Sequence, residues 1–178
     1  MQSIDRLLTQ YGIGEGEDFI VLNAGGNWPL KRWPAKSFVQ LAKTIYEKYG
    51  LKTVLPGGKV DIDASENIAK QAGGCCVVLA GKTTLGQSLA LYKRSRLVIS
   101  SDTGPLHLAH SVGADVMGVF GPTRPSVTGP RGSGRSTVLF KDIGCNKAPC
   151  YHLACADNVC MQAISVEDVM HAIQASFS

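Results

Sequence analysis

The sequence SSDTGPLHLAHSVGADVMGVFGPTRP, which runs from Ser100 to Pro125, places a short polar loop between apolar segments. The preceding run RLVIS predicts a buried strand, PLHLAHSVG has its apolar residues at helical spacing, and DVMGVFG predicts another buried strand. Strand, helix and strand in this order are typical of a parallel sheet with crossover helices. A simple turn does not require the acid Asp102, the hydroxyl of Thr103 or the histidine His107. These three residues are therefore candidates for a functional site.

The same alternation runs along the rest of the chain. Further apolar runs predict strands at residues 18–26, 51–58, 75–81 and 136–140, and helical spacing predicts helices at 3–13, 35–50, 64–74, 85–95 and 166–176. Ten- to fifteen-residue helices between short apolar strands indicate the α/β class, with a doubly wound parallel sheet. Because there is no low-complexity tract, internal repeat or long linker, we expect one domain.

Composition limits the classes of partner. Hydrophobic residues make up 44% and charged residues 18% of the 178 residues, which favours a packed core, and the net charge is +4. No Lys/Arg run with interleaved aromatics is present, so nucleic acid is not an expected partner. No stretch approaches the roughly 20 apolar residues that span a bilayer. The first residues, MQSIDRLLTQYG, lack a signal-peptide core, which favours the cytosol.

The loop that follows RLVIS has the residue types of an anion-binding helix terminus. Gly104 allows close approach of a ligand, Pro105 suits the first helical turn, and Thr103 can donate to a phosphate oxygen. Asp102 suits a sugar hydroxyl better than a phosphate, and His107 could add a donor one turn into the helix. The alternative is structural: Asp102 caps the helix and His107 packs against the sheet. The loop alone leaves both open.

A second loop, NAGGNWPLKRWP, places two cations between two tryptophans. Lys31, held on a loop framed by Trp and Pro, could neutralise a diphosphate, and Trp28 or Trp33 could cover a ring face. The alternative is that Lys31 and Arg32 form a solvated pair beside two core tryptophans, and for this loop alone that interpretation is the simpler one.

Two further loops carry candidate polar residues. GVFGPTRPSVTGPRG is expected to expose Thr123, Arg124 and Thr128, either at the rim of a ligand site or on a plain surface connection. LPGGKVDIDASE supplies Asp61, Asp63 and Glu66, one of which could bind ribose or sugar hydroxyls. The spacing does not choose among these three acids.

Six cysteines divide into two groups. Two lie in the apolar run at 75–81 and are expected to be buried, whereas four recur every fifth residue, at Cys145, Cys150, Cys155 and Cys160. This spacing matches no zinc or iron–sulfur signature, so we expect a loop of thiols and no metal site. The chain also lacks a nucleophile elbow, a Walker loop, an H-E-x-x-H pair and the G-x-G-x-x-G of an ordinary NAD site.

Three segments resemble the C-terminal domain of family 9 glycosyltransferases, the ADP-heptose:lipopolysaccharide heptosyltransferases. They are VLNAGGNWPLKRWPAKSFVQLAKTI, TVLPGG and SSDTGPLHLAHSVGADVMGVFGPTRPSVTGP. The resemblance covers nearly the whole chain, and DTGPLHLA followed by FGPT, with KRWP upstream, is its most specific part. It implies the Rossmann-like C-terminal half of a GT-B enzyme, whose active site lies in the cleft between two halves.

The resemblance also implies roles for five residues. Lys31 would contact the donor phosphates and Asp102 would hold heptose hydroxyls. Thr103, Gly104 and His107 would line the pocket for the diphosphate and the sugar. We expect no cofactor and no metal. The resemblance places no catalytic residue in this chain, because the family's catalytic base comes from the other half.

In that family the N-terminal half binds the acceptor, and no second α/β half precedes residue 18 here. We therefore expect one nucleotide-sugar-binding domain at 1–178, comprising a linker helix at 1–17 and a Rossmann-like domain at 18–178. The complete enzyme would transfer heptose from ADP-heptose to the lipopolysaccharide inner core, in the cytoplasm or in peripheral contact with the inner membrane. This chain alone would be inactive. The alternatives are a different nucleotide sugar or a non-catalytic nucleotide-binding module.

Overall fold

The computed structural model describes residues 3–150, 155 and 157–177 of the chain. Its centre is a sheet of six strands in the order β3-β2-β1-β4-β5-β6, with every neighbouring pair parallel. The strands are β1 (Phe19–Asn23), β2 (Lys52–Leu55), β3 (Cys76–Val78), β4 (Leu97–Ser101), β5 (Val116–Phe120) and β6 (Ser136–Phe140). The predicted α/β class with a doubly wound parallel sheet is confirmed.

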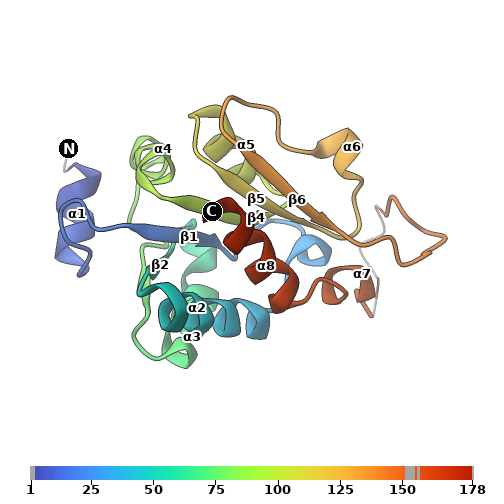
Figure 1. The fold of residues 1–178 in the computed structure, drawn as a ribbon, viewed down its shortest axis with the longest axis horizontal. Helices are drawn as coiled ribbons and strands as arrows, with labels where there is room; N and C mark the ends of the chain where they lie inside the picture. Colours follow the sequence, from blue (N-terminus) through green and yellow to red (C-terminus); the bar gives the residue numbers. More distant parts are fainter. Residues whose placement is uncertain (1–2, 151–154, 156, 178) are drawn as a thin grey trace.

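Helices cover both faces of the sheet (Figure 1). The longer helices are α1 (Ile4–Gln10), α2 (Ala35–Tyr49), α3 (Ile62–Ala72), α4 (Leu85–Arg94), α5 (Gly104–Ser111) and α8 (Val166–Phe177). Short turns of helix are η1 (Pro29–Lys31), η2 (Lys59–Asp61), α6 (Pro125–Thr128) and α7 (Val159–Gln162). Among the described residues, no helix is both long enough and apolar enough to cross a lipid bilayer.

Alternation along each strand divides the core between the two faces. In β1, Ile20 and Leu22 pack with α2, α3 and α8, whereas Phe19 and Val21 pack with α1, α4 and α5. All four side chains are fully buried, which is why the strand is a continuous apolar run in the sequence. The two hydrophobic clusters hold the helices against the sheet and so fix the loops at its edge.

The boundaries of several elements differ from the sequence prediction. The strand predicted at 75–81 is shorter in the structure: β3 ends at Val78, although the N–H of Leu79 still donates to the carbonyl of Leu55 at 2.9 Å. The helix predicted at 64–74 begins two residues earlier, where α3 continues directly from η2. The opening helix α1 buries Ile4, Leu7 and Leu8 in the core beside α4, so the predicted linker helix packs on the domain itself.

The strand order places a crevice between β1 and β4. The chain leaves β1 toward β2 on one side and, after β3, returns to β4 on the other side of β1. Crossovers that diverge in this way leave an opening at the carboxyl ends of the two strands, where ligands bind in open α/β sheets. The two loops that the sequence singled out, at residues 24–34 and 102–105, both begin at this opening.

Candidate functional site

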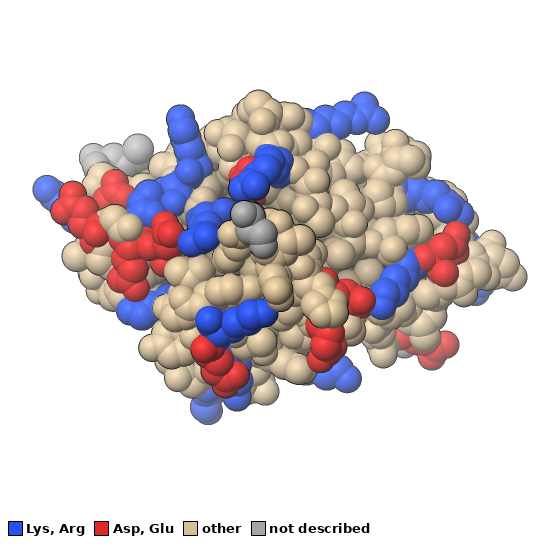
Figure 2. Space-filling view, in the orientation of Figure 1, with Lys and Arg blue, Asp and Glu red and all other residues tan. Residues whose placement is uncertain are grey.

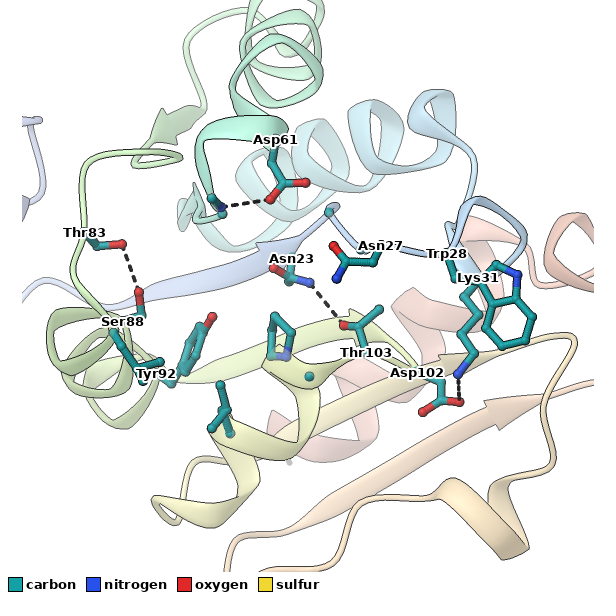
Figure 3. Close-up of a pocket in the computed structure, with 18 residues that line it drawn as sticks. Asn23, Asn27, Trp28, Lys31, Asp61, Thr83, Ser88, Tyr92, Asp102 and Thr103 are labelled. Atoms are coloured by element: carbon teal, nitrogen blue, oxygen red, sulfur yellow. Dashed lines mark hydrogen bonds and ion pairs between the residues drawn. The ribbon is translucent and has the colours of Figure 1, made fainter. Parts of the chain in front are cut away.

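An open cavity of about 480 Å³ lies at the carboxyl ends of the central strands (Figure 3). It is lined by residues that follow four of the strands: Asn23, Gly25, Gly26, Asn27, Trp28, Lys31, Gly57, Gly58, Asp61, Thr83, Leu85, Ser88, Tyr92, Asp102, Thr103, Gly104, Pro105 and Leu108. Polar groups line it on several sides, as is typical of a small-molecule site.

Asp102 is a carboxylate that is 4% exposed at this cavity. Its Oδ2 accepts hydrogen bonds from Lys31 Nζ at 2.7 Å, Thr123 Oγ1 at 2.6 Å and Thr128 Oγ1 at 3.0 Å. Helix α5 begins after Asp102, and the residue at its N-cap position is Thr103, whose side chain makes no capping bond. The alternative in which Asp102 merely caps the helix is therefore wrong.

Opposing influences act on the charge of Asp102. Burial alone would raise the pKa of this carboxyl, but hydrogen bonds from Lys31, Thr123 and Thr128 and the positive charge of Lys31 together lower the pKa below its ordinary value. Asp102 is therefore ionised at neutral pH although it is almost fully buried. A buried, ionised carboxylate with several donors is a good acceptor for a ligand hydroxyl.

Lys31 is held in place by η1 and by Asp102. Its side chain is 16% exposed, and its Nζ also lies 5.1 Å from the centre of the Trp28 ring, which lines the same cavity. Arg32 is exposed instead and donates to the carbonyl of Gly26 at 2.8 and 2.6 Å. The alternative of a solvated Lys–Arg pair beside two core tryptophans is thus wrong for Lys31, and of the two tryptophans only Trp33 is in the core.

The predicted anion-binding terminus lies beside this pair. Thr103 is fixed by its Oγ1, which lies 3.1 Å from Ser100 Oγ and accepts from Asn23 Nδ2 at 3.4 Å. A Cβ on Gly26 would meet Thr103 Cγ2 at 2.9 Å, so the absence of a side chain lets the two loops approach. The N–H of Gly104 lies at the positive end of the dipole of α5, whereas Pro105 has no N–H and the N–H of Leu106 donates to the carbonyl of Thr103 at 3.1 Å.

His107 lies beside the cavity and does not line it. Its side chain is 43% exposed, and its Nε2 lies 3.4 Å from Asp102 Oδ1. His110, on the same helix, is buried and its Nε2 is 2.8 Å from the carbonyl of Gly134, which agrees with a packing role.

Of the three acids after β2, the structure brings one to the cavity. Asp61 lines it, and its Oδ2 accepts from the N–H of Gly58 at 2.8 Å. A Cβ on Gly25 would meet the Asp61 carboxylate at 2.5 Å, so the glycine makes room for this acid between two loops. Asp63 and Glu66 are exposed on α3 and do not line the cavity.

Sequence reasoning missed several polar residues that complete the site. Asn23 ends β1, and on the side of the cavity away from Lys31, Thr83 precedes α4 while Ser88 and Tyr92 lie within that helix (Figure 3). Their signal in the sequence was weak, because a Thr or Ser near a helix start is ordinarily a cap, and the neighbouring Thr84 does form a capping box with Gln87.

Thr123 was expected to be exposed and is instead 1% exposed, because its hydroxyl turns inward to Asp102. Thr128 is half-buried for the same reason. The loop therefore folds over the carboxylate, and its threonines face the protein interior.

The cysteines do not form a metal centre in the described part of the chain. All six are free thiols; burial raises the pKa of Cys76 to about 12, so it is no nucleophile at neutral pH. The four cysteines of the tail line one small apolar cavity, but no three His, Cys, Asp or Glu side chains among the described residues are placed to hold an ion. Residues 151–154 and 156 of this tail lie outside the described residues.

Comparison with known proteins identifies the family. The model of glycosyltransferase family 9 (heptosyltransferase) matches residues 3–158, most of the chain. The chain belongs to glycosyltransferase family 9. Lipooligosaccharide heptosyltransferase 2 of Haemophilus ducreyi is 35% identical over 108 residues, which are 57% of this chain and 31% of that protein.

Two solved structures share the fold. The family 9 glycosyltransferase of Veillonella parvula is similar with a TM-score of 0.78 and 27% identity over 95% of this chain and 49% of that chain. The ADP-heptose LPS heptosyltransferase II of Escherichia coli has a TM-score of 0.79 and 23% identity over 97% of this chain and 50% of that chain. The chain thus spans about half the length of these two proteins and shares the fold of the part that it matches.

Proposed function

We propose that this chain is the donor-binding half of a heptosyltransferase-like glycosyltransferase and that its cavity binds ADP-heptose or a related nucleotide sugar. The observation that carries the proposal is the buried Asp102–Lys31 pair beside the N-terminus of α5. An ammonium group and a helix N-terminus favour a diphosphate, whereas an ionised carboxylate favours sugar hydroxyls. A nucleotide sugar carries both groups side by side.

The layout of the cavity supports an assignment of its two ends. Lys31 and the backbone N–H groups of Thr103 and Gly104 would bind the diphosphate, and Asp102 would hold the sugar hydroxyls next to it. Asp61, on the upper wall in Figure 3, is placed to accept from ribose hydroxyls. The end near Tyr92 would then receive the base. In this arrangement His107 supports the site through Asp102, without touching the donor from within the cavity.

The chemistry proposed for the complete enzyme is attack of an acceptor hydroxyl on the anomeric carbon of the donor. The bond from that carbon to the diphosphate oxygen breaks, and the hydroxyl proton passes to a general base. Lys31 and the amino end of α5 would stabilise the negative charge that develops on the leaving diphosphate. The base and the site for the lipopolysaccharide core acceptor are assigned to the other half of the enzyme.

Three further expectations belong to the same proposal. The chain alone binds the donor and transfers nothing, because no general base faces the sugar from the described residues of the cavity except carboxylates already engaged in binding. The complete enzyme works in the cytoplasm, with peripheral contact at the inner membrane. Nucleic acid is not a partner: in Figure 2, Lys and Arg side chains are interspersed with Asp and Glu over the face shown.

Isothermal titration of the chain with ADP, UDP, GDP and ADP-heptose tests the proposal. We expect ADP and ADP-heptose to bind. Lys31→Ala should weaken both about tenfold to a hundredfold, the usual loss for a hydrogen bond to a charged group. Asp102→Ala should weaken only ADP-heptose, and exposed Lys36 supplies the control Lys36→Ala.

Three outcomes would contradict parts of this proposal. Preference for UDP or GDP would favour another nucleotide sugar. Binding of no nucleotide would favour an interaction module and exclude donor binding. Transfer of heptose by the chain alone would show that a base is present in it.

A further inference from the structure

The two oxygens of Asp102 have very different surroundings. Oδ2 accepts three hydrogen bonds, from Thr123 at 2.6 Å, Lys31 at 2.7 Å and Thr128 at 3.0 Å. Among the described residues, the partner of Oδ1 is His107, whose Nε2 lies 3.4 Å away, at the outer limit of a hydrogen bond. A carboxylate oxygen offers about two lone pairs. Oδ2 is therefore saturated, while Oδ1 keeps its capacity to accept.

This asymmetry is more than the burial of a charge requires. A buried carboxylate is stabilised when donors are shared between its two oxygens, because each oxygen needs partners. Here the three short hydrogen bonds come from η1, from the loop after β5 and from α6, and all three converge on Oδ2, while His107 lies 3.4 Å from Oδ1. The other oxygen belongs to a residue that lines the cavity. The pattern fits a carboxylate that is anchored on one side and offered to a ligand on the other.

The loop that carries the two threonines is itself firmly held. A Cβ on Gly121 would meet Met161 Sδ at 2.5 Å, and the carbonyl of Pro122 accepts from the N–H of Cys150 at 2.7 Å. Through these contacts Gly121 and Pro122 pack against the rest of the protein, and they fix the position of the adjacent Thr123. The turn of helix α6 then places Thr128 five residues later against the same oxygen.

We propose that Thr123 and Thr128 are positioning residues, which hold Oδ2 of Asp102 so that Oδ1 accepts a hydrogen bond from a hydroxyl of the donor sugar. This inference rests on the proposed binding of a nucleotide sugar and extends it to residues outside the cavity lining. A carboxylate fixed before the ligand arrives loses less rotamer freedom on binding, so the anchoring raises affinity for the sugar without touching it.

The binding test compares two ligands that differ only in the sugar. Thr123→Val and Thr128→Val each remove a hydroxyl and nearly keep the side-chain volume. We expect either variant to bind ADP-heptose about tenfold more weakly while ADP binding is unchanged, because one hydrogen bond to a charged group is lost. Thr123→Ser, which keeps the hydroxyl, should restore ADP-heptose binding. Thr53→Val, at a fully buried threonine of β2 that does not line the cavity, is the matched control.

A second measurement does not depend on any nucleotide. The pKa of the Asp102 carboxyl is followed by NMR through its carbon shift as pH is lowered, in the unliganded chain and in the same variants. Loss of the Thr123 bond should raise this pKa, while Thr123→Ser and Thr53→Val should leave it low. The charged or titratable groups that face Asp102 are Lys31 and His107, and both are present in every variant.

The outcomes separate the two proposals. If the unchanged chain binds neither ADP nor ADP-heptose, the proposed function and the sugar contact both fail, and the titration still decides whether the threonines anchor Asp102. If ADP-heptose binding and the pKa of Asp102 are the same in both valine variants as in the unchanged chain, the anchoring is refuted. If ADP binding falls as much as ADP-heptose binding, the threonines only maintain the fold. Should Thr123→Val fail to fold, the half-buried Thr128→Val carries both measurements.

Discussion

Two aspartates of this chain make similar contacts in very different places. Asp102 and Asp168 each accept a hydrogen bond from a lysine and from a hydroxyl or N–H group, and in each the pKa is lowered. Asp168 lies at the start of α8, where it accepts from the N–H of Ser165 while Ser165 Oγ accepts from the N–H of Asp168. Asp102 lies at the opening between β1 and β4.

The two aspartates differ in how far they are buried and in how far along the sequence their partners lie. Asp168 is 31% exposed, and its Lys141 partner is 47% exposed, so water solvates both. Asp102 is 4% exposed, and its partner Lys31 is 71 positions away in the sequence. The first arrangement is a local helix cap that also makes a surface ion pair. The second gathers distant loops around one charge, and this arrangement supports the proposed binding site.

The largest expected effect follows from removing each lysine. Lys31→Met should lower the free energy of unfolding by about 3 kcal/mol, because it leaves a buried carboxylate without its cation. Lys141→Met should cost about 0.5 kcal/mol, since exposed pairs contribute little. Urea unfolding of both variants measures the two values. If both variants lost the same free energy of unfolding, Asp102 would be solvated as freely as Asp168. The distinction between the two aspartates would then be wrong.

The next effect is the pH dependence of stability. Both carboxyls have a folded-state pKa below the ordinary 3.8, so near that pH the unfolded chain binds more protons than the folded chain. The stability that they contribute is complete above the ordinary value and is lost as pH falls through the lowered folded-state pKa. Asp102→Asn should therefore flatten the decline of stability as pH falls below about 4 more than Asp168→Asn does, because the exposed pair is screened by solvent.

Unfolding by urea across this pH range checks the prediction, and added salt provides the control. Salt should reduce the contribution of Asp168 and leave that of Asp102 nearly unchanged, because buried pairs are screened far less. If the free energy of unfolding of Asp102→Asn fell with pH just as that of the unchanged chain does, the hydrogen bonds and the charge of Lys31 would not be what keeps the Asp102 carboxyl ionised.

The contrast also shows what could be predicted from the sequence. The fold followed from apolar runs that alternate with helical spacing, and the two loops around Lys31 and Asp102 were singled out by residue type alone. Since parallel strands end at one edge of a sheet, the two loops were expected on that edge. Their direct contact was not derivable, because it depends on β1 and β4 being neighbours although β2 and β3 lie between them in the chain.

Other parts of the site could not be predicted from the sequence, for physical reasons. The segment of Thr123 is rich in Gly, Pro and Thr, which ordinarily indicates exposure, whereas in the structure Thr123 is buried and donates to Asp102, a residue 21 positions away in the sequence. Among the three acids after β2, the choice of Asp61 depends on the space left by Gly25, a fit between loops that no local pattern encodes. The helix cap at Ser165 was predictable, because capping is a local interaction.

That local cap supplies the smallest expected effect. Ser165→Ala removes the hydroxyl that accepts from the N–H of Asp168, and it should lower the free energy of unfolding by about 1 kcal/mol. Ser165→Thr keeps the hydroxyl and should restore stability. Neither change should alter the binding of ADP or ADP-heptose, because α8 contributes no residue to the cavity lining. If Ser165→Ala weakened nucleotide binding while the chain remained folded, the cap and the site would be coupled, and burial would no longer distinguish the two aspartates.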